Sequence, residues 1–537
     1  MKKIKYILGA ALAALTVSAC VGDLNVIPID PNLNTADKAL TSEEDFLNLL
    51  AGVYTGYATP GYYGKDGSPS LSGLDGGASQ YIRGLYHHSE LTTDESVCGW
   101  NDQTIKNFHW MNWTTDDAFI YSFYSRIFMQ VAAANEFIRE AKATTVEFAN
   151  KQQYIDEARV LRALAYYHAI DNFGNVPFAD ETAVVGAVPE QIKRADLYNW
   201  LVTELTDLTG SSALPERAAT QYGRVNKSVA KFILAKVYLN AEIYSGTAAY
   251  DKCATVLKSL MGDGYTLHTT PNGTIYSAYQ ELFLADNDKC TDEIIFAVEQ
   301  NGANTNSYGA TNYLIFASTG DVMPTDELGI SAGWGGLRMT PQFYDKFSAG
   351  DARKLFWDDT CSYQTTGDDG ETSTVNSNQQ KDIDDIGEFT NGFAFMKFRN
   401  VASDGTPGSE LGSVDTDFPM MRYADVLLMA AEVAKRNASS GIDGVGALNQ
   451  VRTRAGLATV ADYSLQDVLD ERARELYQEC WRRSDLIRYG QFTTSAYLWQ
   501  WKGNVKEGKA VEDYRNLFPI PQSDRQANAG LTQNEGY

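Results

Sequence analysis

The segment of residues 228–244 reads SVAKFILAKVYLNAEIY, and its apolar residues fall on two separate faces of a helix. One face carries Val229, Ile233, Val237, Ala241 and Tyr244, and the other carries Ala230, Leu234 and Tyr238. A helix with two apolar faces must be covered on both sides, as is a helix inside a stacked array. The segment therefore predicts one long helix within a mainly α fold.

A second helix is expected at residues 250–261, and it completes a helix–turn–helix unit resembling a tetratricopeptide repeat. The chain shows no strict period of about 34 residues, so divergent repeats and an ordinary helical bundle both remain open. Helical spacing and N-cap residues predict further helices near Ser42 and at 118–142, 152–172, 423–436, 445–454 and 464–489.

Between about residues 265 and 419 the helical pattern is lost. Short apolar runs, such as 293–298, alternate there with Gly, Asn, Thr and Asp, and residues 365–378 are almost wholly polar. This pattern predicts an irregular insertion with a few strands and short helices. We expect residues 41–537 to form one domain, with a helical scaffold at about 41–262 and 420–537 and the insertion at about 265–419.

The first 40 residues have the features of an export and anchoring signal. Lys2, Lys3 and Lys5 precede an apolar run, and small residues at 17–19 precede Cys20. We expect residues 1–19 to be a cleaved lipoprotein signal peptide, Cys20 to be acylated, and residues 20–40 to form a tether. The alternative is an ordinary signal peptide whose cleavage site lies near an unrelated cysteine.

Charge and cysteine content narrow the function further. The net charge of −24 argues against a nucleic-acid partner, because phosphate binding requires a basic surface. The five cysteines after Cys20 are widely spaced without a C-x-x-C pair, which favours buried free thiols over one or two disulfides. Five scattered histidines give neither a metal-ligand spacing nor a nucleophile and base.

Six motifs occur in order along the chain. They are LRALAYY at 161–167, FGNVPF at 173–178, FPMMRYAD at 418–425, RRSDLIRYG at 482–490, FPIP at 518–521 and QNEGY at 533–537. Together they resemble the SusD-like (SusD/RagB) lipoproteins of Bacteroidetes over essentially the whole chain. The resemblance implies a tetratricopeptide-like helical superhelix with a large loop-rich insertion. We expect Arg162, Arg422 and Arg483 of these motifs to hold the scaffold together rather than to contact a ligand.

The resemblance also implies a function. SusD-like proteins are non-catalytic glycan-binding proteins that cap a SusC-like TonB-dependent transporter, lipid-anchored on the extracellular side of the outer membrane. Stretches at 67–69, 90–95, 282–288 and 497–503 are similar to the starch-binding member, which makes starch or malto-oligosaccharides the leading ligand. The alternatives are another glycan, a repeat scaffold with mainly protein partners, and a glycoside hydrolase, for which carboxylate spacing in sequence carries no weight.

A neutral sugar offers hydroxyls and apolar C–H faces, so its binder needs exposed rings and side chains that bridge hydroxyls. The resemblance assigns these roles to Asp75, Arg83, Trp100, Tyr308 and Trp334. It also aligns Gln103 with a contacting asparagine, with Asn101 and Asp102 close by, and it places Cys98 where a second tryptophan stands.

The sequence context favours exposure of the three rings. Glycines flank Trp100, Tyr308 and Trp334, and glycine adds little to a packed core. The alternatives are that these rings pack in the core, and that Asp75 and Arg83 pair with each other or with the scaffold. Four further residues are candidates to extend the surface: His87, His88, Trp110 and Trp113. The alternative for the two tryptophans is the core, where tryptophans that flank helices more often lie.

The resemblance further suggests a structural calcium ion bound by Asp288, Asp415 and Asp417. These residues lie in the oxygen-rich stretches DND and DTD, and calcium prefers oxygen ligands. Acidic turns are common in so anionic a chain. No catalytic cofactor is expected.

Overall fold

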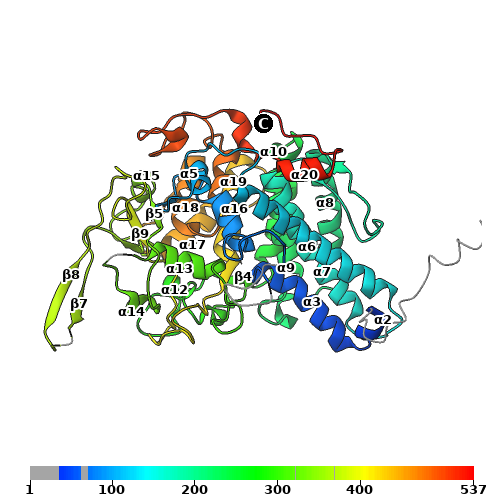
Figure 1. Ribbon diagram of the computed structural model, residues 1–537, viewed down its shortest axis with the longest axis horizontal. Coiled ribbons are helices and arrows are strands. Elements are labelled where there is room, and N and C mark those ends of the chain that lie inside the picture. Colours follow the sequence, from blue (N-terminus) through cyan, green and yellow to red (C-terminus); the bar gives the residue numbers. More distant parts are fainter. Residues whose placement is uncertain (1–35, 62–69, 321, 368) are drawn as a thin grey trace, which may run out of the picture.

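The computed structural model describes residues 36–61, 70–320, 322–367 and 369–537 (Figure 1). The predicted signal peptide, Cys20 and most of the predicted tether lie outside the described residues, as do residues 67–69. In the described part of the chain, no helix is both long and apolar enough to cross a bilayer.

The scaffold is a series of helices in which each packs on the next. The long helices are α3 (Glu43–Ala58), α6 (Ala118–Ala143), α7 (Lys151–Asn172), α8 (Arg194–Gly210), α9 (Lys227–Leu239), α11 (Tyr250–Met261), α16 (Tyr423–Arg436), α17 (Gly444–Arg454) and α18 (Leu465–Leu476). Along the series α6 packs on α7, α7 on α8, α8 on α9, α9 on α11, and α11 on α16 (Figure 1). The predicted mainly α, tetratricopeptide-like fold class is confirmed.

Helix α9 shows why the helices stack. Residues from both of its apolar faces, including Ile233 and Leu234, are buried, and α8 and α11 both pack on it. The prediction of one helix over 228–244 is wrong in one respect, because the chain breaks at Asn240. That residue leaves helical geometry with ψ 12°, its side-chain amide donates to the Lys236 carbonyl at 3.0 Å, and α10 (Ala241–Ser245) starts a new helix.

The single helix predicted over 464–489 is also two helices. Ser464 caps the first as expected, because its hydroxyl accepts the Asp467 N–H in a capping box. However, α18 ends at Leu476, and α19 (Arg482–Arg488) is separate. Between them Gln478 and Cys480 have φ angles of 60° and 69°, which a continuous right-handed helix excludes.

The insertion contains small sheets, as predicted. Strand β4 (Ile294–Val298) pairs with β10 (Phe418–Arg422). The largest sheet has the order β1-β5-β9-β6, formed by Val97–Cys98, Leu337–Met339, Phe393–Phe395 and Phe356–Trp357. Strands β7 (Ser362–Thr366) and β8 (Thr372–Asn376) form a polar hairpin that projects from the body (Figure 1). Two further short strands pair with each other, β2 (Val176–Pro177) and β3 (Gln191–Ile192).

Short helices complete the fold. They are α2 (Ala36–Ala39), α4 (Tyr81–Ser89), α5 (Gln103–His109), α12 (Ala278–Glu281), α13 (Ala310–Ser318), α14 (Thr325–Leu328), α15 (Pro341–Tyr344) and α20 (Gln522–Ala527). Two of the motif arginines lie among the scaffold helices. Arg162 pairs with Glu181 at 2.6 Å and with Glu204 at 2.9 Å, and Arg483 donates to the Asn516 carbonyl at 2.6 Å. The scaffold role predicted for both is confirmed.

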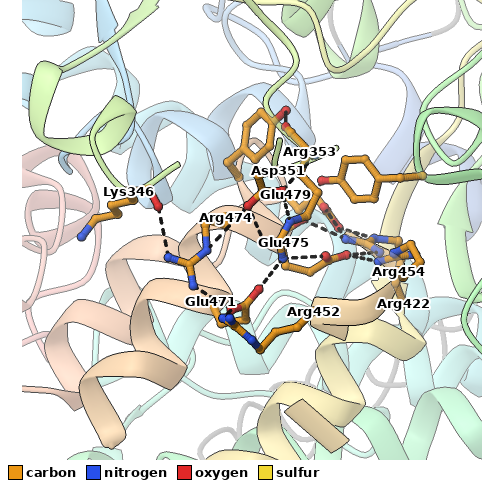
Figure 2. Close-up of polar contacts among 12 residues, drawn as sticks. Lys346, Asp351, Arg353, Arg422, Arg452, Arg454, Glu471, Arg474, Glu475 and Glu479 are labelled. Atoms are coloured by element: carbon orange, nitrogen blue, oxygen red, sulfur yellow. Dashed lines mark hydrogen bonds and ion pairs between the residues drawn. The ribbon is translucent and has the colours of Figure 1, made fainter. Parts of the chain in front are cut away.

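A buried ion-pair network joins the insertion to the C-terminal helices (Figure 2). Arg422 of β10 contacts Glu293 at 2.5 Å, Glu479 at 2.7 Å and Glu475 at 3.1 Å. The network continues through Asp351, Arg353, Lys397, Arg452, Arg454, Glu471 and Arg474. The side chains of Arg422, Glu293 and Glu475 have no exposed surface. Arg422 therefore has the structural role predicted for it.

The cysteines that the structure describes are free thiols, as predicted. Cys98, Cys253, Cys290 and Cys480 are buried, and Cys361 is half-buried. Burial raises the pKa of the Cys98 thiol to about 11. This thiol is therefore protonated at neutral pH and is a poor nucleophile.

Replacing the central cation of the network should destabilise the whole protein. Arg422→Met leaves the Glu293, Glu475 and Glu479 carboxylates buried with one cation fewer, which is expected to cost about 3–5 kcal/mol of unfolding free energy. Urea unfolding followed by circular dichroism measures the loss. Lys506→Met is the control, because the Lys506–Asp384 pair is exposed and should contribute little. Equal midpoints for the two variants would contradict a central role for Arg422.

Candidate functional site

Three aromatic rings from distant parts of the chain form one surface. Trp100 follows β1, Tyr308 precedes α13, and Trp334 precedes β5. Ring centroids lie 6.4 Å apart for Trp100 and Trp334, and 5.7 Å apart for Tyr308 and Trp334. The Trp100 indole N–H donates to the Trp334 carbonyl at 3.0 Å. All three rings are half-buried, so each keeps part of its area open to a ligand. We call these three residues the aromatic surface.

The β1–β5 register brings two of these rings together. Cys98 pairs with Leu337, and the Gly99 N–H donates to the Gly336 carbonyl at 3.0 Å. A Cβ at position 336 would lie 2.9 Å from the Trp100 indole, closer than real Cβ contacts. Glycine at this position therefore lets the indole lie flat against the backbone that leads from Trp334 into β5.

Arg83 of α4 lies against this surface from the protein side. Its guanidinium carbon is 5.5 Å from the Trp100 ring centroid and 4.5 Å from that of buried Tyr313. One Nη donates to the Tyr308 carbonyl at 3.1 Å, while Nε has no hydrogen-bond partner within the described residues. Burial lowers the pKa of Arg83, and nearby groups including Asp75 oppose that change. The guanidinium of Arg83 thus lies beside the rings, and its unpaired Nε is buried beneath them.

The other predicted polar residues lie on the protein surface. Asp75 is exposed and accepts the Ala78 N–H at 2.7 Å. Asn101 and Gln103 are also exposed, and each has a local partner: Asn101 accepts from Lys106 at 2.5 Å, and Gln103 donates to Asn107 at 2.8 Å. The structure therefore brings together Arg83, Trp100, Tyr308 and Trp334. It places Asn101 and Gln103 on the exposed segment that follows Trp100.

Most of the proposed additions to the surface are wrong. His87 and His88 of α4 have no exposed area and pack against Phe119 and Phe108 respectively. Trp113 is also buried, and its indole N–H donates to the hydroxyl of the C-terminal tyrosine. Trp110 is half-buried and packs against a small apolar cluster of Val97, Ile383 and Ile386. The rings of His87, His88 and Trp113 fill the core between elements that the sequence alone could not place together.

Phe389 is a further candidate that the sequence interpretation missed. It is half-buried, and its ring lies 3.7 Å from where a Cβ would stand on Gly335, next to Trp334. The guanidinium carbon of Arg338 lies over this ring, 5.9 Å from its centroid. Phe389 is the one aromatic residue in the polar stretch GEFTNG at 387–392, so the same argument from loop context would have found it.

The three aspartates suggested for calcium have different surroundings. Asp415 accepts the Gly302 N–H at 2.7 Å and the Ser409 hydroxyl at 2.8 Å. Asp417 is buried, and burial, reinforced by the charges of Glu299 and Asp288, raises its pKa to about 7. The charges of Asp288 and Glu299 therefore act on Asp417, but within the described residues these carboxylates do not bring their ligand atoms within 4.8 Å of one another. Glu299 was not predicted from the sequence. Like Asp415, Asp417 already accepts hydrogen bonds, from the Gln300 N–H at 2.6 Å and from the Tyr222 hydroxyl at 2.9 Å.

A tetratricopeptide-like scaffold with a loop-rich insertion is the fold of SusD-type proteins, a class of binding proteins. Residues 292–537 match the family described as "SusD family", and residues 77–239 match the one described as "Starch-binding associating with outer membrane". The chain is 32% identical to "Starch-binding protein SusD" of Bacteroides thetaiotaomicron, over 100% of this chain and 99% of that protein. The chain belongs to the SusD family.

Other relatives and solved structures agree. "SusD-like protein P2" of Formosa agariphila is 24% identical over 79% of this chain and 81% of that protein. Surface glycan-binding protein A of B. thetaiotaomicron has a TM-score of 0.70 at 21% identity, over 93% of this chain and 100% of that one. Its complex with laminarihexaose has a TM-score of 0.68 at 20% identity, over 92% and 99% of the two chains. At such identities these structures establish the fold alone.

Proposed function

We propose that this protein binds a glycan at the aromatic surface without cleaving it. The observation that carries the proposal is the grouping of three half-buried rings around Trp334, with the Arg83 guanidinium beside Trp100. Flat rings cover the apolar faces of sugars, and a guanidinium bridges neighbouring hydroxyls. Asp75, Asn101 and Gln103 lie at the surface, where they supply further hydrogen bonds to such a ligand.

Starch or malto-oligosaccharides are the proposed ligands. The starch-binding relative that aligns over the full chain supports this choice. The resemblance places a second tryptophan at position 98, where this chain has the buried Cys98, so the aromatic surface has one ring fewer. Phe389, next to Gly335, is the ring positioned to extend the surface. The complex of a structural neighbour with laminarihexaose makes a different glycan the second candidate.

We also propose that the protein is attached to the outer membrane by lipid on Cys20 and delivers its glycan to a SusC-like TonB-dependent transporter. The family description "associating with outer membrane" supports the location. The leader of residues 1–19 and the small residues before Cys20 support the lipid, because acyl chains provide attachment for a chain whose net charge of −24 disfavours anionic membranes.

A structural calcium ion bound by Asp288, Asp415 and Asp417 is a further proposal, with the charge of Glu299 also acting at Asp417. Burial, reinforced by the charges of Glu299 and Asp288, keeps the Asp417 pKa near 7, and a divalent cation beside the carboxylate would favour its charged form. It would connect the turn at Asn287–Lys289 to β10, which begins directly after Asp417.

The glycan site predicts specific losses of binding. Trp100→Ala and Trp334→Ala should each weaken amylopectin binding by about 2 kcal/mol, or roughly thirtyfold, because each removes a ring at the centre of the site. Phe389→Ala should have a smaller effect. Affinity electrophoresis in gels with and without polysaccharide measures retardation, and Trp200→Ala on α8 is the matched control.

Unchanged migration of the Trp100 variant relative to wild type would refute the site. A parallel screen of β-glucans, fructans and host glycans would show whether a ligand other than starch is preferred. Steady release of new reducing ends from soluble starch would contradict the non-catalytic proposal.

The lipid anchor predicts a change of location only. Cys20→Ala should release the protein from membranes while leaving glycan binding intact, since Cys20 is remote in sequence from the aromatic surface. Fractionation of cells followed by immunoblotting measures the change. Continued recovery of the variant with membranes would contradict the anchor.

The calcium proposal predicts a pH-dependent stability. The pKa of Asp417 rises from 3.8 to about 7 on folding, so the folded state holds a proton that the unfolded state has lost. Stability in EDTA should therefore fall as the pH rises from about 4 to 7. Calcium should restore stability above pH 7, as measured by the melting temperature. Asp417→Asn should lose both effects, and an undiminished calcium response in that variant would rule out this site.

A further inference from the structure

A second cluster of ligand groups lies at the start of the insertion. His268, Glu281 and Cys290 are buried, and each places a ligand atom within 4.8 Å of the other two. They come from three segments: the loop after α11, the last residue of α12, and the residue after the 3-10 turn Asn287–Lys289. We infer that this cluster is a binding site for a zinc ion.

The spacing suits tetrahedral zinc after a small adjustment. His268 Nε2 lies 3.0 Å from Glu281 Oε2. Zinc bonds of about 2.0–2.3 Å place neighbouring ligand atoms about 3.3–3.8 Å apart, so this pair opens by a few tenths of an ångström. On binding, the hydrogen shared by His268 and Glu281 and the Cys290 thiol proton pass to solvent. Nitrogen, carboxylate oxygen and thiolate then ligate the ion, and water takes the fourth position.

The surrounding contacts orient the ligands. His268 Nδ1 lies 2.9 Å from Asp292 Oδ2, which is the carboxylate–histidine arrangement that fixes a metal-binding imidazole with Nε2 toward the ion. The two Glu281 oxygens accept backbone N–H groups, from Asn272 at 2.6 Å and from Gly273 at 2.7 Å. The Asp292 side chain is 41% exposed, whereas the three proposed ligands are buried.

The donor set selects the metal. Calcium and magnesium prefer oxygen ligands, whereas one thiolate, one imidazole and one carboxylate suit zinc. The Cys290 sulfur has a weak contact with the Asn272 side-chain amide at 3.9 Å, and its other hydrogen-bond partner is His268, which is itself a proposed ligand. A metal would therefore replace the contact between the thiol and His268.

The site lies next to the buried ion network. The backbone N–H of His268 donates to one Glu293 oxygen at 2.7 Å, and the other Glu293 oxygen pairs with Arg422 at 2.5 Å. A bound ion would fasten the loop after α11 to the segment that enters β4. The role is structural, and it is independent of the glycan proposal.

Cobalt provides a direct test, because a thiolate bound to Co²⁺ gives a charge-transfer absorption band that carboxylates do not give. The chelator-treated full chain, kept in excess calcium, is titrated with Co²⁺ and then with Zn²⁺. We expect one equivalent of Co²⁺ to produce the band, and one equivalent of Zn²⁺ to abolish it and raise the melting temperature. Cys290→Ser should lose the band, and Asp292→Asn should weaken Zn²⁺ binding at least tenfold.

Cys361→Ser is the matched control, because Cys361 is the more accessible free thiol, and this variant should behave as wild type. If Cys290→Ser fails to fold, alkylation of Cys290 in the wild type replaces it: Zn²⁺ should slow labelling of Cys290 but not of Cys361. Absence of the band in the wild type, its persistence in Cys290→Ser, or equal labelling of Cys290 with and without Zn²⁺ would overturn the proposal. Each of these results would leave His268 as a metal-free link between the carboxylates of Glu281 and Asp292.

Discussion

The fold depends on charged side chains that are buried between the insertion and the C-terminal helices of the scaffold. Arg422 belongs to the strand that leads into α16, whereas Glu475 and Glu479 lie at the end of α18 and just beyond it (Figure 2). Glu293, which also pairs with Arg422, directly precedes β4. Burial by itself raises the pKa of Glu475, but Arg454, Arg422 and Arg353 outweigh it and lower that pKa to about 2. Desolvating so many charges offsets much of their attraction, so the network contributes mainly by excluding alternatives. A packing that keeps these charges buried but moves the insertion out of register with the scaffold leaves a charge without its partner, which is strongly unfavourable.

This constraint explains how loops can present an ordered binding surface. Trp100 and Trp334 lie outside regular helices, where side chains ordinarily have freedom, yet the strands beside them belong to one sheet. The N–H groups of Trp334 and Gly336 each donate at 2.8 Å to carbonyls of α13, Phe316 and Ala317 respectively. Backbone hydrogen bonds to a helix thus fix the segment that carries Trp334, and the buried faces of both tryptophans pack on residues of the same helix, Phe316 and Tyr313. Such a site leaves part of each ring open to a ligand, and binding costs little conformational entropy because the rings are already ordered.

The sequence predicted what depends on local pattern and failed where distant residues decide. Two apolar faces identified α9, and Ser464 with Asp467 identified the start of α18, because periodicity and capping act within a few residues. The breaks at Asn240 and at Gln478 were missed because the apolar pattern continues across them. At Gln478 the competing interaction is its N–H bond to Glu95, which lies 383 positions away. The glycine-flanked rings were predicted from the family resemblance and loop context together. The effect of Glu299 on Asp417 and the mutual contacts of the rings could not be predicted, because they arise between residues that only the fold brings together.

Cys98 changes more than the number of rings relative to the family pattern, in which a tryptophan stands at this position. It is only 1% exposed, and the strand pairing with Leu337 directs it into the protein, where the charges of Arg338 and Arg83 act on its thiol. An indole at this position would have to displace one of these arginines, because close-packed interiors do not absorb such a volume. The backbone that supports Trp100 is therefore adapted to a small side chain at 98, with Arg83 in the space beneath the rings. Shape, and not only ring number, must then set which glycan the surface prefers, and Phe389 on the other side of Gly335 is the residue placed to change that shape.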